Sequence, residues 1–549
     1  MIPRDQPRSR RFAAELEMTR RSLALGLSAT VLAVPGLAAA AEVTGPFLDV
    51  RRFGARGDGS TVDSGAINRA IQAATRRGGG TVVVPPGRYL CFSVRLLDNV
   101  TLMLSAGAVI EAADPEVHGA HYDFPENALE EQFQDFGITH VHNSLIYADG
   151  ARNIALVGHG MLHGAALERE GPGDRWHNRP DWRSPREQGL TPEQARLLDP
   201  RERQMQGRAN KTIGLMRCRG VLLRDFTILQ GGHFGVIAHG VSNMTVDNLT
   251  IDTDRDGIDI DCCRDVRVTN CVVNAPKDDA IVLKSSYALG AKVACENVTV
   301  ANCTTSGYLM GSLLDGSFRK SDYDAPDKLG PLGRIKLGTE SNGGFRDIQI
   351  TGCTCEHSRG ILVGVVDGGT LEDVSVTNIT LREPVNHPLF VHQAARLRAP
   401  AGTAVGACRR VRFSNIAVSG ADPRFPCGVA GIADAPVEDI SFSDVHVQHR
   451  GGGTAEDARR VPEDRRVTSL EVSFMGTLPA QGFYARHARR LTLHNVSIAA
   501  DAPDARPTVA LDDVQGAIID NLISPRERAD AVAARGSSGI AIGNVRRWS

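Results

Sequence analysis

A short strand-like pattern recurs through the chain and constrains its fold more than any other feature. Alternating apolar and polar residues lead to a polar or small residue, as in MTVDNLTI and VRVTNCVV. Copies follow each other at 22 or 23 residues where the repeat is shortest, and at up to 51 where loops are inserted. No two-residue hairpin turn links them, so the pattern indicates a single-stranded parallel β-solenoid, one coil per repeat. An ordinary β-sandwich would need ten matches by coincidence. The ten end positions are Asp225, Asn248, Asn270, Asn302, Gly352, Asn378, Asn415, Asp444, Asn495 and Asn521.

Composition and charge agree with a solenoid and exclude some partners. Glycine supplies 57 of the 549 residues and aromatic residues only 5%, as expected for narrow corners around a thin aliphatic core. Lys plus Arg (62) nearly balances Asp plus Glu (64), which gives no basic surface for nucleic acid or membrane. We therefore expect no nucleic-acid partner and no stable membrane insertion; the oligomeric state stays open.

The first 41 residues have the pattern of an export signal. Arg20 and Arg21 precede an apolar run that ends in small residues near Ala40. The paired arginines suggest twin-arginine export, and Met18 is a possible true start. We expect an exported protein, periplasmic or secreted, whose residues 42–549 form one β-helix domain.

Residues 42–90 are expected to cover the open end of the solenoid. Asp63 or Ser64 can cap a helix whose apolar positions, from Ile67 to Ala74, recur at helical spacing. An uncovered end would expose the core and strand edges to other chains, so this helix predicts an N-terminal cap.

Eleven cysteines would suit disulfides in an exported protein, but their placement favours another role. Cys271, Cys303 and Cys353 each follow the corner residue of a coil, so stacking predicts a ladder of small buried side chains. Disulfides remain possible. No cysteine or histidine cluster has zinc spacing, and we expect neither a structural metal nor a cofactor.

Three aspartates carry the strongest chemical signal. Asp256 and Asp278 are 22 residues apart, one short repeat, and Asp279 follows directly. Strands in a sheet lie about 4.8 Å apart, so stacked coils would bring these carboxyls together at one azimuth. Clustered carboxylates divide into a protonated acid and an ionised base, as glycosidic hydrolysis requires. Capping of turns or calcium binding is the alternative role. Asp259 and Asp261 alternate with two isoleucines and are expected to face outward.

Two segments carry a family resemblance. FGARGDGSTVDSGAINRAI with GGGTVVVPPGRYL resembles the start of the pectate-lyase-like right-handed parallel β-helix superfamily. NLTIDTDRDGIDIDCCRDVRVTNCVVNAPKDDAIVLKSS resembles glycoside hydrolase family 28, the polygalacturonases and rhamnogalacturonases, with Asp254-Arg255-Asp256 in place of that family's Asn-Thr-Asp. The resemblance implies inverting hydrolysis of a pectin-type, uronic-acid- or rhamnose-containing poly- or oligosaccharide. In it Asp278 would protonate the leaving oxygen, while Asp256 and Asp279 would activate water.

The resemblance and the repeat also predict the wall of a substrate cleft. An inserted loop over residues 307–344 is expected to contribute to it. In the family a histidine follows the aspartate pair, but here Arg334 takes its place, and Leu362 and Gly364 stand at the basic positions that grip the substrate carboxylate. Either Arg334 and Lys336 grip that carboxylate from one coil earlier, or the bound sugar is not a plain galacturonate. The predicted substrate-binding residues of the wall are His233, Lys284, Arg334, Lys336, Arg359 and His387.

A second insertion, residues 171–207, holds Trp176 and Trp182. Long insertions in solenoids usually lie over the binding face, where tryptophans can stack on sugar rings or anchor the loop itself. A lid of this kind would favour exo-action.

Two other classes of protein remain open. A β-helix polysaccharide lyase would use a calcium-bridged uronate and an Arg or Lys base. A non-catalytic carbohydrate-binding or adhesin solenoid would use the same surface without turnover.

Overall fold

The structure is a computed structural model that describes residues 47–126, 133, 139–169, 207–320, 330–468 and 470–547. The predicted export signal, residues 1–41, lies outside the described residues, as do Trp176, Trp182 and almost all of the predicted 171–207 lid. Among the described residues, no helix combines the length and apolar character needed to cross a membrane.

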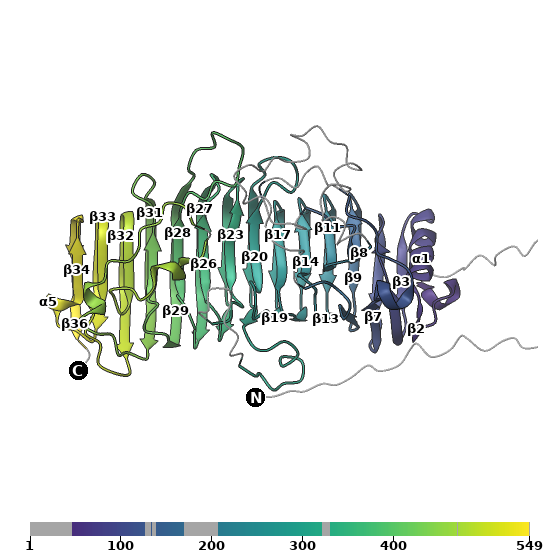
Figure 1. Ribbon diagram of the computed structural model, residues 1–549, viewed down its shortest axis with the longest axis horizontal. Coiled ribbons are helices and arrows are strands. Elements are labelled where there is room, and N and C mark those ends of the chain that lie inside the picture. The colour runs from purple at the N-terminus through teal and green to yellow at the C-terminus, as the bar shows by residue number, and fades with distance from the viewer. Residues whose placement is uncertain are drawn as a thin grey trace, which may run out of the picture. The chain divides into compact units, whose positions relative to one another are not determined.

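The chain winds into one continuous coil, and the parallel strands of successive turns stack into three sheets (Figure 1). From β3 to β24 each strand pairs with the strand three further along the chain, because three strands make one turn of the coil. The predicted parallel β-helix is therefore confirmed.

The first sheet carries the strands on which the aspartates lie. Its strands are β5 (Val94–Arg95), β8 (Ser144–Asp149), β11 (Lys211–Met216), β14 (Phe234–His239), β17 (Asp256–Asp261), β20 (Ile281–Ser285), β23 (Ile335–Ser341), β26 (Ile361–Val365), β28 (Leu389–Gln393) and β30 (Cys427–Ala430).

The second sheet alternates buried and exposed residues along each strand. It comprises β3 (Gly80–Val84), β6 (Val100–Leu104), β9 (Arg152–Val157), β12 (Arg219–Arg224), β15 (Ser242–Asp247), β18 (Arg264–Thr269), β21 (Cys295–Ala301) and β24 (Phe345–Thr351). The third comprises β4 (Gly87–Cys91), β7 (Ala108–Ala112), β10 (Met161–His163), β13 (Thr227–Leu229), β16 (Thr250–Asp252), β19 (Val272–Asn274), β22 (Thr304–Ser306) and β25 (Thr354–Glu356).

Later in the chain, long bent strands merge neighbouring sheets. They are β27 (Thr370–Arg382), β29 (Ala407–Ala421), β31 (Val437–His449), β32 (Phe483–Ala500) and β33 (Val509–Ser524), followed by α5 (Arg528–Ala531), β34 (Val532–Arg535), β35 (Ser538–Ile542) and β36 (Val545–Arg547).

All ten predicted corner residues have left-handed backbones, with φ between 52° and 71°. Asn, Asp and Gly tolerate this conformation best, which explains their recurrence at the corner between the second and third sheets. Stacked corners also bond to each other: Asn415 Nδ2 donates to Asn378 Oδ1 at 2.7 Å.

Helix α1 (Ser64–Arg76) lies across one end of the coil, beside β1 (Phe47–Asp49), the turn η1 (Val50–Phe53) and β2 (Asp58–Val62) (Figure 1). Ile67 and Ile71, two residues of this helix, are fully buried. Asp63 occupies the N-cap position, but its carboxylate accepts from the backbone of Arg56 and Gly57 instead of capping the helix. A shorter helix, α2 (Pro115–His118), follows β7.

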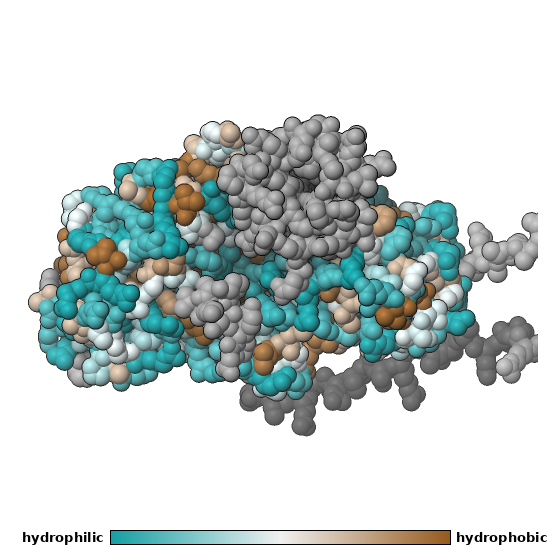
Figure 2. Space-filling model, viewed as in Figure 1, coloured by the Kyte–Doolittle hydropathy of each residue, from teal (hydrophilic) through white to brown (hydrophobic). Residues whose placement is uncertain are grey.

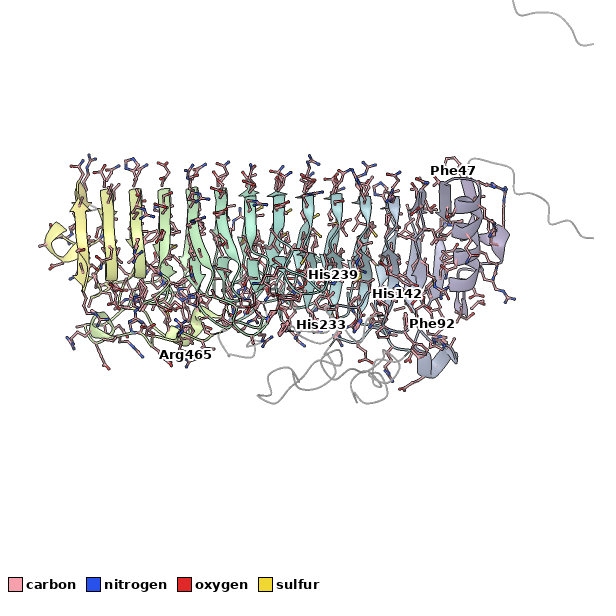
Figure 3. All side chains as sticks on the ribbon, turned by 90° about the horizontal axis from the view of Figure 1, so that it is seen from above. Phe47, Phe92, His142, His233, His239 and Arg465 are labelled. Atoms are coloured by element: carbon pink, nitrogen blue, oxygen red, sulfur yellow. The ribbon has the colours of Figure 1, made fainter. Side chains whose placement is uncertain are left out.

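All eleven cysteines lie in described residues and are buried free thiols. The Cys303 thiol is within hydrogen-bonding reach of the thiols of Cys271 and Cys353, so the predicted ladder forms at the corner. Elsewhere the described surface facing the viewer in Figure 2 is mostly hydrophilic, with small apolar patches. Rows of side chains repeat along the coil, one row per turn (Figure 3).

Candidate active site

Asp256, Asp278 and Asp279 form one carboxylate cluster. Asp256 begins β17, and the other two lie in the turn that leads into β20. Each offers a carboxylate oxygen, and the three oxygens lie within 4.8 Å of one another. The backbone N–H of Asp279 donates to Asp256 Oδ1 at 3.2 Å and to Asp278 Oδ1 at 3.0 Å. The coil thus brings together the three residues that the sequence singled out.

The register within the cluster differs from the predicted one. Ile258 pairs with Ile281, an offset of 23 and not 22, because the turn before β20 holds one more residue than the preceding coil. Asp279 is therefore the residue that corresponds to Asp256 in the next coil, and Asp278 lies one residue before it. In the previous coil Phe234, not His233, pairs with Asp256. The expected common azimuth of Asp278 with Asp256 is wrong by one residue.

Each aspartate of the cluster has its own cation. Lys284 Nζ lies 3.3 Å from Asp256 Oδ2. Arg255 lies 3.0 Å from Asp278 Oδ2. Asp279 receives two: Arg334 Nε at 2.6 Å and Lys336 Nζ at 3.1 Å. Arg255 was not predicted as a site residue. It is the middle residue of Asp254-Arg255-Asp256, the motif that differs from the Asn-Thr-Asp of the polygalacturonases.

Burial and charge separate the pKa values of Asp256 and Asp278. Burial, followed by repulsion from Asp259 and Asp278, raises the pKa of Asp256 well above its usual range. Burial also acts to raise the pKa of Asp278, but Arg255 and Lys336 outweigh it and lower that pKa. Asp278 is the outermost of the three, with a side chain 25% exposed against 6% for Asp256 and 3% for Asp279. The opposite directions of these two pKa shifts favour Asp256 over Asp278 as the proton-holding member of the pair.

Asp259 and Asp261 were expected to face outward, and both are in addition fully buried. Both point away from the aliphatic core, but other polar residues cover them. Asp259 Oδ2 lies 2.5 Å from Lys284 Nζ, and burial raises its pKa to about 7. Asp261 accepts from Ser286 and lies 2.9 Å from His239 Nδ1. These two residues support the wall beneath the cluster.

A second group of charges adjoins the trio: Arg334, Lys336 and Arg359, all at most 6% exposed, converge on Glu471. Arg334 pairs with Glu471 through both terminal nitrogens, and Arg359 Nη1 lies 3.1 Å from Glu471 Oε2. Glu471 begins the 3-10 turn η4 (Val472–Met475); a further turn, η3 (Asp457–Arg459), precedes it. The sequence offered one signal for this insertion, the 51-residue gap between Asp444 and Asn495.

The two predicted histidines behave differently. His233 is half-buried and accepts from Arg255 Nη2 at 3.2 Å, so it adjoins the cluster through that arginine. His387 is buried between Phe390 and Phe425, with Nδ1 2.7 Å from the Pro426 carbonyl. Burial lowers its pKa to about 4. The structure brings His387 into an apolar setting and does not place it against the aspartates.

The trio has the oxygen donors and spacing of a possible cation site. Lys284, Arg334 and Lys336, however, already neutralise these carboxylates. That arrangement opposes a further positive charge and suits acid–base chemistry better.

Comparison with known proteins defines the class of the fold. Residues 47–132 match a family model described as rhamnogalacturonase A/epimerase, pectate lyase-like, and residues 203–316 match one for a right handed beta helix region. An exopolygalacturonase from Thermotoga maritima superposes with a TM-score of 0.50 at 20% identity, over 73% of this chain and 87% of that one. PfbA, a surface adhesin of Streptococcus pneumoniae, gives 0.51 at 12% identity, over 84% and 91%. The chain is a right-handed parallel β-helix.

Curated relatives refine that class. A probable polygalacturonase from Vitis vinifera is 22% identical over 354 residues, 60% of this chain and 60% of the relative. Alginate lyase 7 from Azotobacter vinelandii is 56% identical over 41 residues, 8% of this chain and 5% of the relative. The chain thus spans 60% or less of the length of these relatives. The resemblance to polygalacturonases predicted from the aspartate motifs is confirmed.

Proposed function

We propose that this protein is a glycoside hydrolase that cleaves a pectin-type, uronic-acid- or rhamnose-containing poly- or oligosaccharide by an inverting mechanism, with exo-action. One observation carries the proposal: three carboxylates whose oxygens lie within 4.8 Å stand at the motif positions of polygalacturonases, each beside its own cation. Such a cluster separates an acid from a base within one cleft.

Asp256 and Asp278 act as a pair that shares one proton. Two strongly interacting carboxyls titrate together, and here the proton of the resting pair sits on Asp256. Asp278 is the exposed member, so it faces the leaving oxygen. The proton passes from Asp256 to Asp278, and Asp278 donates it as the glycosidic bond breaks. Asp256, now ionised, takes a proton from the attacking water, which restores the resting pair.

Asp279 is the positioning member of the trio. Arg334 and Lys336 bind both of its oxygens, and its own N–H bonds to the two other carboxylates. These contacts fix the spacing of Asp256 and Asp278 around the water.

Product stereochemistry tests the inverting step. Carboxyls in inverting glycosidases are usually about 6.5–9.5 Å apart, and those in retaining enzymes about 5–5.5 Å. The close approach of the oxygens here makes the measurement decisive. NMR of the first product released from pectic oligosaccharides should show inversion at the anomeric carbon; net retention would reject the mechanism.

Substitution tests the hydrolase itself. Asp278→Asn and Asp256→Asn should each lower kcat by about 10²–10⁴. Asp444→Asn is the matched control, because asparagine occupies the same left-handed corner in neighbouring coils. Unchanged turnover in Asp278→Asn would favour a binding solenoid, which the fold alone permits, since an adhesin superposes as well as a polygalacturonase. A product absorbing in the near ultraviolet would instead indicate a lyase.

We also propose export through residues 1–41. Cell fractionation should place the protein outside the cytoplasm, and replacing Arg20 and Arg21 with lysine should retain it inside.

A further inference from the structure

We propose that Glu471 is a specificity-determining residue that fills the anion site of the cleft wall, so that the sugar bound there is neutral and not a uronate. This inference rests on the proposed function for its setting in a sugar-binding cleft. It goes beyond that function because it names the class of sugar and a residue that selects it.

Glu471 pairs with all three members of the basic cluster, Arg334, Lys336 and Arg359. Arg334 pairs with it through two nitrogens, Arg359 Nη1 lies 3.1 Å away, and Lys336 Nζ lies 3.9 Å away. The remaining contacts of these cations are also made within the protein: Arg334 and Lys336 bind Asp279, and Arg359 donates to the Gly330 carbonyl at 2.9 Å. A substrate carboxylate would have to displace Glu471 to reach them.

Close packing holds Glu471 in place. Its neighbour Leu470 is fully buried in an apolar cluster with Leu362, Phe390 and Val472. A Cβ atom at Gly364 would lie 2.4 Å from Leu470 Cδ1, and one at Gly338 would lie 2.7 Å from Cδ2. Leu470 therefore fits only because those two positions are glycines.

The same packing explains the departure from the polygalacturonase pattern. Leu362 and Gly364, which replace the expected basic residues, form the seat of Leu470. Figure 3 shows His233 on the same long side of the coil as Arg465, a residue of the insertion that also carries Glu471. The apolar residues at positions 362 and 364 and the segment that carries Glu471 thus belong to one packed unit.

Charge favours a neutral sugar at this place. The Glu471 side chain is 32% exposed, so its outer lone pairs can accept hydroxyl hydrogen bonds. A uronate would meet a fixed negative charge beside cations that already have carboxylate partners, and like charges brought together oppose binding. A uronate that displaced Glu471 would separate it from the buried arginines and break their charge-assisted hydrogen bonds.

D-Galactose and D-galacturonate are matched probes because they differ only in the oxidation state of C6. Ligand-observed NMR titration should give wild type a lower Kd for galactose than for galacturonate. Glu471→Ala empties the anion site, so galacturonate should bind about tenfold tighter or better, with a smaller change for galactose. Glu438→Gln is the matched control: Glu438 also pairs with two arginines, Arg489 and Arg490, and is 30% exposed, but it lies on β31, on the outer surface of the second sheet.

The outcomes are separable from those of the proposed function. The titration needs no turnover, so the predicted reversal can be observed in Asp278→Asn protein as well as in wild type. A purely structural role of Glu471 would change stability in thermal denaturation but not the ratio of the two Kd values. Preference of wild type for galacturonate, or no gain in galacturonate binding by Glu471→Ala, overturns the proposal.

Discussion

Arg255 lies 3.0 Å from the carboxylate of Asp278 and donates to His233 with the same terminal nitrogen, so one guanidinium joins the outermost aspartate to the preceding coil. The polygalacturonase motif has threonine at this place. An uncharged residue there would leave Asp278 without its nearest cation. Arg255 therefore helps to lower the pKa of Asp278.

The first prediction concerns pH. In the proposed mechanism the Asp256–Asp278 pair must hold one proton. Activity should therefore be lost as pH falls through the lowered pKa of Asp278 and as pH rises through the raised pKa of Asp256. Arg255→Thr removes a cation beside Asp278, and we expect the acid limb of kcat/KM to move up by about one pH unit. Arg264→Thr, an exposed arginine on β18, is the control. An unchanged acid limb would show that Arg255 does not set that pKa.

The second prediction concerns Lys284, which is buried between Asp256 and Asp259. Lys284→Met leaves two buried carboxylates without their cation and should lower the free energy of unfolding by about 3–5 kcal/mol. Adding Asp259→Asn should restore part of the loss, with a coupling of about 1–3 kcal/mol in denaturant titrations. Strict additivity of the two substitutions would contradict this account.

A matched control for Lys284 is the exposed pair of Lys320 and Glu383. Lys320→Met should change the free energy of unfolding by at most about 1 kcal/mol, because solvent screens exposed pairs.

The third prediction tests the seat of Leu470. Gly364→Ala would place a methyl group 2.4 Å from Leu470 Cδ1 and 2.6 Å from the His392 carbonyl oxygen. We expect a loss of about 1–3 kcal/mol in chemical denaturation, together with earlier proteolysis near Glu471. Gly65→Ala, in the first turn of α1, meets only the flexible end of Arg69 at 3.5 Å and should not destabilise the protein. Equal effects of the two substitutions would show that Leu470 is not seated as described.

The fourth prediction concerns buried His387. Its pKa is about 4 in the folded protein, against 6.5 for an exposed histidine, so the unfolded chain binds the extra proton first as pH falls. Stability should decrease from about pH 6.5 to pH 4, by on the order of 3 kcal/mol from this residue. His387→Gln should flatten that dependence in denaturation midpoints, whereas exposed His446→Gln should leave it unchanged. A dependence as steep as in wild type would contradict neutral burial of His387.

The repeat could be predicted from sequence because each corner requires a left-handed residue, and that need is visible as Asn, Asp or Gly. The aspartate trio followed from the same spacing. The spacing missed the extra residue before β20, since corners stayed 22 apart while the wall shifted to 23. Glu471 escaped because it arrives from an insertion far along the chain, and local patterns carry no trace of such a contact. The glycines at positions 338 and 364 leave the space that Leu470 fills. Their role is visible only in the structure, where Leu470 packs against them.

The buried thiols have a practical consequence. They run from Cys91 on β4 to Cys427 on β30, and none is joined to another. A membrane-impermeant alkylating reagent should find no reactive site on the intact protein and eleven on the unravelled one. Mass spectrometry after brief exposure at rising denaturant would therefore report, turn by turn, where the coil first opens. The buried cysteines thus allow local unfolding to be followed at several points between β4 and β30.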